Sequence, residues 1–135
     1  MSEGATKDEV VRRLHGQITD HGFAIVPVGR GEKARGWAYT VGLVAGMDHP
    51  ELVIAGYPLG HAVAILDDLG RLAVAGERLD AGPGSITYWG VTVSAVPVHP
   101  WQIRRGLISA WRGYYDSLGR RDLDPRALQI VLPDG

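Results

Sequence analysis

Residues 37–55, WAYTVGLVAGMDHPELVIA, predict two strands joined by a turn. In the first strand, 37–43, large and small side chains alternate: Trp37, Tyr39, Val41 and Leu43 share one face, and Ala38, Thr40 and Gly42 share the other. The turn at 46–50 is too short for a parallel crossover, so the second strand, 51–55, is expected to pair antiparallel with the first. The small face leaves room for a helix, another backbone or a ligand to approach closely.

The rest of the chain alternates helices and strands around this pair. A capping-box pattern at residues 6–9 begins the first helix, and Gly22 follows its last turn. The helix expected over 60–75 has the widest apolar face in the chain. The other expected elements are strands at 23–28, within 86–98 with a break at Gly90, and at 127–132, and one helix from Pro100 to Leu118.

This order, α-β-β-β-α-β-β-α-β, predicts an α+β fold in a single domain over residues 1–135, with residues 1–5 flexible. The sheet is expected to be mostly antiparallel or mixed, with about six strands, because two connections between strands are too short for a parallel crossover. Three helices are expected to cover one face of it. A chain of 135 residues has the commonest size of a single domain and can bury a sufficient core without a disulfide.

The composition argues against several classes of function. The 14 basic and 15 acidic residues give a formal net charge of −1, so the chain lacks the basic surface that nucleic-acid binding needs. No stretch approaches the ~18 apolar residues of a membrane span, and the first residues carry no secretory signal. Together with the absence of cysteine, these features predict a cytoplasmic protein. The oligomeric state stays open, with a homodimer as one alternative.

Familiar catalytic and cofactor motifs are missing from the sequence. There is no P-loop, no Gly-x-Gly-x-x-Gly after a strand and no Gly-x-Ser-x-Gly nucleophile turn. The five histidines are scattered, and no His-Glu-x-x-His pattern occurs. We therefore predict no metal site, and the sequence indicates no particular cofactor.

The best candidate for a site is the run Asp48-His49-Pro50-Glu51. A histidine beside a carboxylate can act as a general acid and base or as a pair of metal ligands, and His49 and Glu51 lie two residues apart at the start of a strand. The alternative is structural: His49 and Asp48 stabilise the turn, while Glu51 lies at a strand end facing water. A single His-x-Glu is frequent by chance, which favours this alternative.

Five further residues are candidates for the same site. His99 lies where a strand meets a helix, a common place for functional residues, although it is equally explained as the helix N-cap or as a surface residue. Tyr39 is a candidate acid–base partner from the first strand. The candidates for ligand binding are Thr40, Gly42 and Trp101, with the alternative that a helix fills the small face of that strand.

Three segments carry a resemblance to a known family. They are His21-Gly22-Phe23, the block Ala38-Tyr39-Thr40-Val41-Gly42-Leu43 with His49-Pro50-Glu51-Leu52-Val53-Ile54, and Leu128 to Asp134. Together they resemble an uncharacterised bacterial family, domain-of-unknown-function family 4262, over about residues 21–134. The resemblance implies no activity, because none is assigned to the family, but His49 and Glu51 match its motif. Members often continue into an aromatic, proline-containing tail, whereas this sequence ends at Gly135.

Three functions are compatible with these observations. The first is a small-ligand-binding domain with its pocket beside strands 37–43 and 51–55, with Thr40 and Gly42 as a floor. The alternative is a small enzyme, such as a hydrolase, isomerase or cyclase, in which His49 and Glu51 carry acid–base chemistry with Tyr39 and His99 nearby. The third is a protein-interaction module that presents exposed Trp and Tyr side chains.

Overall fold

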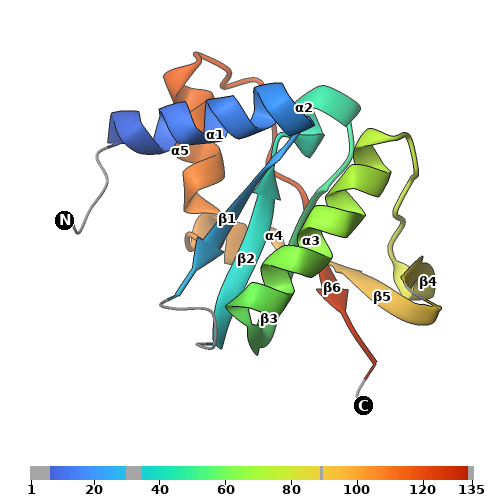
Figure 1. Ribbon diagram of the computed structural model, residues 1–135. Helices are drawn as coiled ribbons and strands as arrows, with labels where there is room; N and C mark the ends of the chain where they lie inside the picture. The colour runs from blue at the N-terminus through green and yellow to red at the C-terminus, as the bar shows by residue number, and fades with distance from the viewer. Residues whose placement is uncertain (1–6, 30–34, 89, 134–135) are drawn as a thin grey trace.

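The expected pair of strands is present in the sheet. Strand β2 (Arg35–Val41) and strand β3 (Glu51–Pro58) pair antiparallel, with Tyr39 opposite Val53. The computed structural model describes residues 7–29, 35–88 and 90–133 (Figure 1). The predicted flexibility of residues 1–5 and the predicted cap at Thr6 lie outside these ranges.

In the described ranges, six strands form one mixed sheet in the order β1-β2-β3-β6-β5-β4. Strands β3 and β6 run parallel, and the other neighbouring pairs run antiparallel. The remaining strands are β1 (Ala24–Val28), β4 (Gly82–Tyr88), β5 (Val91–Pro97) and β6 (Ala127–Val131). The α+β class and the mixed sheet of six strands in a single domain are thereby confirmed.

The same part of the chain forms five helices, two of them single short turns of five residues. They are α1 (Lys7–His21), α2 (Leu43–Met47), α3 (Leu59–Val74), α4 (Pro100–Arg104) and α5 (Ser109–Ser117). None of these helices combines the length and the apolar sequence that crossing a lipid bilayer requires.

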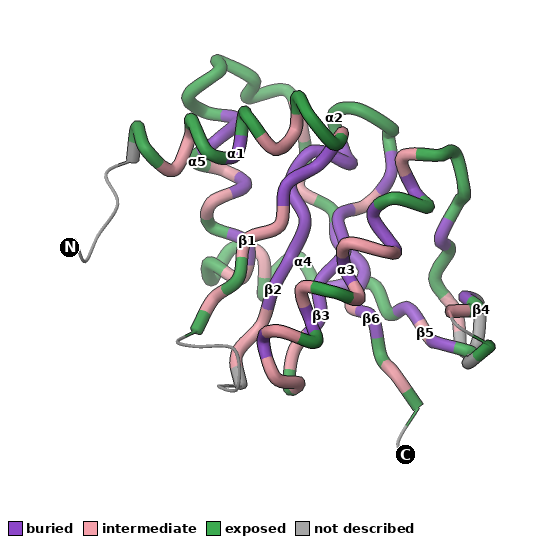
Figure 2. The backbone as a smooth tube through the Cα atoms, viewed as in Figure 1, coloured by how far each residue is buried: buried purple, intermediate pink, exposed green. Residues whose placement is uncertain are grey.

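Helices cover both faces of the sheet, whereas one covered face was expected. On one side Ala38, Leu52 and Ile54 pack in a core with the apolar side of α3. On the other side Tyr39 and Val53 pack in a second core with residues of α1 and α5. The reason is visible in the sequence, because successive residues of β2 and β3 point to opposite faces and are apolar on both. Figure 2 shows these central strands buried along most of their length.

Helix α3 packs on the small face of β2 at Ala38. This agrees with one of the two interpretations of the sequence, in which a helix fills that face. Ala38 is 0% exposed and belongs to the same core cluster as Ala62 and Leu66 of that helix. The helix also approaches β1 closely, because a Cβ atom added to Gly70 would overlap the ring of Phe23. At Ala38 the bare side of this strand is therefore covered by α3.

Two local elements differ from the prediction. Strand β2 ends at Val41, and the following residues form the short helix α2 instead of continuing the strand to Leu43. The single helix expected from Pro100 is divided into α4 and α5, because Gly106 adopts a left-handed conformation with φ of 101°. The bond from the Leu107 amide to the Gln102 carbonyl, 3.3 Å, closes the end of α4.

Candidate functional site

A buried carboxylate organises the centre of the molecule. Glu51, the first residue of β3, is 0% exposed. Its Oε1 atom accepts hydrogen bonds from the Thr40 hydroxyl at 2.8 Å and the Leu43 amide at 3.2 Å. Its Oε2 atom accepts from the Gly42 and Val44 amides, each at 3.1 Å, and from Nε1 of Trp111 at 2.9 Å. One side chain therefore holds β2, α2 and α5 to the start of β3.

These contacts give Thr40, Gly42 and Glu51 a structural role. The first amides of a helix have no partners within it, and a carboxylate there is favoured by the helix dipole. At α2 the carboxylate that accepts from these amides belongs to Glu51 of β3, and not to the residue that precedes the helix. Gly42 is required at the turn, because its φ is 121° and a Cβ atom would lie 3.2 Å from the Gly22 carbonyl oxygen.

The burial of Glu51 changes its acidity. Burial raises the pKa of the Glu51 carboxyl to about 6, against the opposing effect of the hydrogen bonds from Val44, Thr40, Trp111 and Leu43. Burial and the nearby Glu51 carboxylate together raise the pKa of the Tyr115 phenol.

We expect the Glu51 carboxyl to titrate with a midpoint near pH 6, against 4.5 in the unfolded chain. Between these values the folded protein holds a proton that the unfolded chain has released, so the contribution of Glu51 to the free energy of unfolding falls as pH rises. The expected loss is about 2 kcal/mol. The side-chain carboxyl carbon, followed by NMR across this range, measures the midpoint directly. A midpoint below 4.5 would show that the hydrogen bonds outweigh burial, and this contribution would then rise with pH.

His49 is also held inside the protein. It is 2% exposed, its Nδ1 lies 2.7 Å from the Pro50 carbonyl oxygen, and its Nε2 accepts a hydrogen bond of 3.0 Å from the Leu79 amide. A ring that donates through one nitrogen and accepts through the other is a neutral imidazole, here with the proton on Nδ1. His49 therefore ties the turn before β3 to the segment that follows α3.

Tyr39 and His99 make their contacts elsewhere. The Tyr39 hydroxyl accepts a hydrogen bond of 2.9 Å from the Ala110 amide, and burial raises the pKa of this phenol. His99 is the N-cap of α4: its Nδ1 accepts from the Trp101 amide at 3.0 Å, and its own amide donates to Gln102 at 3.3 Å. The capping interpretation of His99 is therefore the one that its contacts support.

The predicted residues thus fall into separate places rather than one pocket. Thr40, Gly42 and Glu51 meet in the buried cluster, and the contacts of Tyr39, His49 and His99 are with other segments. None of the hollows described below is lined by His49 or Glu51.

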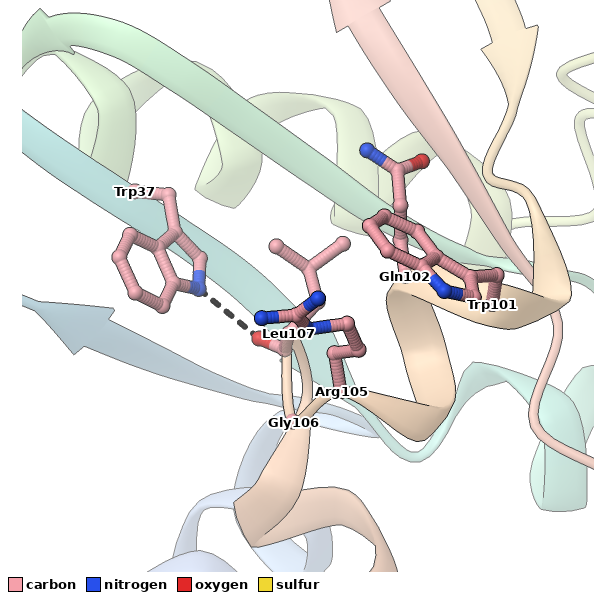
Figure 3. A pocket seen from close by; sticks show the side chains of 6 residues that line it. All are labelled: Trp37, Trp101, Gln102, Arg105, Gly106 and Leu107. Carbon is pink, nitrogen blue, oxygen red and sulfur yellow. Dashed lines mark hydrogen bonds between the residues drawn. The ribbon is translucent and has the colours of Figure 1, made fainter.

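A surface hollow of about 260 Å³ brings Trp101 together with Trp37, which comes from β2 (Figure 3). The two indoles lie on opposite sides of it, with Arg105 and Leu107 between them. Nε1 of Trp37 donates to the Leu107 carbonyl at 2.8 Å, and this bond fixes the indole against the linker between α4 and α5. The Arg105 guanidinium lies 4.9 Å from the centre of the Trp101 ring, a cation–π contact.

A second hollow, of about 390 Å³, lies on the same linker and shares Gly106 with the first. Arg104 and Arg112 line it, over an apolar base that includes Trp111. The Arg112 guanidinium stacks on the Trp111 ring at 4.9 Å and donates to the Leu123 carbonyl at 3.2 Å. Among the described residues, three arginines and no acidic residue line the two hollows.

A family model places this chain among known sequences. The family described as Domain of unknown function (DUF4262) matches residues 17–135, nearly the whole chain. The chain belongs to this family. Searches of curated proteins and of solved structures gave no match.

In this DUF4262 chain, the block that carried the resemblance builds the interior. Thr40, Gly42 and Glu51 form the buried cluster at the start of α2, and His49 and Pro50 form the turn that leads into β3. The residues that line the surface hollows, Trp37, Arg105 and Arg112, were not selected from the sequence. The sequence signal that could have pointed to them is the number of tryptophans, because the N–H of a buried Trp side chain usually donates a hydrogen bond to a specific partner.

Proposed function

We propose that this DUF4262 domain binds a small planar anion in the hollow between Trp37 and Trp101. The observation that carries the proposal is the convergence of two indoles and a guanidinium on one concave surface. Tryptophan faces hold flat apolar rings, and an arginine beside them supplies charge and hydrogen bonds for a carboxylate or phosphate. The hollow contains Trp101, one of the predicted ligand-binding residues, but neither Thr40 nor Gly42, which were expected as the floor of the pocket.

The size and charge of the hollow narrow the ligand class. Its volume of about 260 Å³ is below the ~300–1,000 Å³ of sites for drug-sized ligands, which favours a ligand of one or two rings. Trp101 is 51% exposed, so part of its indole surface is accessible to a second ring. In a chain of net charge −1, a surface lined by arginine without carboxylates favours an anion.

The acid–base enzyme is the weaker alternative. A general acid or base must reach the proton that it transfers, directly or through one water. His49 and Glu51 are 2% and 0% exposed, and each is occupied by hydrogen bonds within the fold. The ligand-binding function also fits a cytoplasmic bacterial domain without nucleic-acid or membrane partners. The balance of acidic and basic residues argues against nucleic-acid binding, and the absence of cysteine fits a reducing compartment.

We expect indole-3-carboxylate to bind more tightly than its neutral amide, as measured by isothermal titration calorimetry. Arg105→Gln should weaken binding of the carboxylate about tenfold and leave the amide unchanged, because a charge-assisted contact is worth about 1.5–3 kcal/mol. Trp101→Ala should weaken both probes. Arg121→Gln, which removes an exposed charge outside the hollow, is the matched control. Equal affinity of the two probes, or an unaltered affinity in Arg105→Gln, would contradict the proposal.

A further inference from the structure

Helices α1 and α5 leave a groove between them on a different part of the surface. Its volume is about 610 Å³, more than twice that of the hollow at Trp37. The floor is apolar: Val10, Val11 and Leu14 of α1 face Ala110 of α5. Leu14 is 1% exposed, whereas the two valines are partly exposed. The groove thus presents apolar surface to solvent in a volume that suits a small molecule.

The groove is open above α5 because that helix has a glycine there. Gly113 is exposed, lines the groove and lies within the helix, and a Cβ atom added to it would meet nothing within 4 Å. A glycine inside a helix costs about 0.5–1 kcal/mol relative to alanine. Gly113 therefore lowers the stability of α5 at the position where a larger side chain would extend into the groove.

The charge of the groove is opposite to that of the Trp37 hollow. Asp8 and Asp116 line it, and no basic residue lines it among those that the structure describes. Among the described residues, the ion-pair partner of Asp116 is Arg112, at a long distance of 3.5 Å, with both side chains 41% exposed. An exposed pair of this length contributes little, so the Asp116 carboxylate stays available to a second cation. The hydroxyl of Tyr114 is already hydrogen-bonded to His15 at 3.1 Å.

From this geometry we propose a second ligand site, which takes a small organic ammonium ion with an apolar body. The apolar body lies on Val10, Val11 and Leu14 over Gly113, and the ammonium group is paired with Asp8 and Asp116. The proposal is independent of the anion site, because the described residues that line the two hollows are different and carry opposite charge.

The test uses phenethylammonium and its neutral counterpart 2-phenylethanol as probes, with amide shifts in NMR titrations as the readout. Phenethylammonium should shift the amides of α1 and α5 and bind at least fivefold more tightly than the alcohol. Asp8→Asn combined with Asp116→Asn should remove this difference. Equal binding of the two probes by the native protein, or shifts outside these helices, would overturn the proposal.

Filling the groove provides the second arm of the test. Gly113→Leu places a side chain in the open volume and should weaken phenethylammonium binding at least tenfold. Gly16→Leu is the matched control, because Gly16 is an exposed glycine of α1 that also has nothing within 4 Å of an added Cβ and does not line the groove. Both substitutions replace a helical glycine by a better helix former, so both variants are expected to fold. Native affinity in Gly113→Leu would overturn the proposal.

Discussion

Replacing Glu51 by alanine is expected to lower the free energy of unfolding by at least about 3 kcal/mol, because the change leaves five donors without their acceptor. Each buried donor left unpaired costs about 1–3 kcal/mol, and partial relaxation or entry of water reduces the sum. The affected groups belong to β2, α2 and α5, so the loss reaches three elements at once.

Urea denaturation of Glu51→Ala measures this loss, and Glu51→Gln separates charge from shape. Glutamine has the same size and removes the charge that burial disfavours, but its amide NH₂ replaces an acceptor and would face donors, so we expect a loss smaller than that of Glu51→Ala. Glu77→Ala is the matched control, because Glu77 is exposed, and it should change stability by less than about 0.5 kcal/mol. A loss below about 1 kcal/mol in Glu51→Ala would show that the cluster is not a principal source of stability.

The central hairpin was predictable because its signals are local. Alternation of large and small residues in β2 and the short turn before Glu51 fix an antiparallel pair without information from the rest of the chain. Gly22 was also recognised after the last turn of α1, and its positive φ of 91° suits a helix C-terminus. Neither the strand order nor the parallel pairing of β3 with β6 has such a local signal.

The candidate site was predicted less well, for a physical reason. Glu51 was expected at a strand end, beside Thr40 and Gly42, and these three do meet. Whether a carboxylate at that place faces a ligand or the interior depends on what covers it. Here the cover is Trp111, which lies 60 residues further along the chain. No spacing in the sequence predicts that contact.

The division of the third expected helix shows the opposite case, in which a local signal was overlooked. Gly106 lies inside an apolar pattern that continues at helical spacing, so the pattern predicted one helix. A glycine with φ of 101° ends α4 and redirects the chain into α5. The redirection places Arg105 in the hollow with Trp37 and Trp101, the arrangement on which the proposed anion site rests.

Leu66→Ala and Leu69→Ala are each expected to lower the free energy of unfolding by about 2–5 kcal/mol, from the lost transfer free energy and the cavity left behind. Both side chains are 0% exposed on α3 and belong to the core between this helix and the sheet. Leu72→Ala is the matched control: Leu72 is on the same helix but 38% exposed, so its loss should be clearly smaller. Urea denaturation of the three variants measures the difference. Losses below about 0.5 kcal/mol at both Leu66 and Leu69 would mean that α3 is peripheral to the core, contrary to its packing against β2.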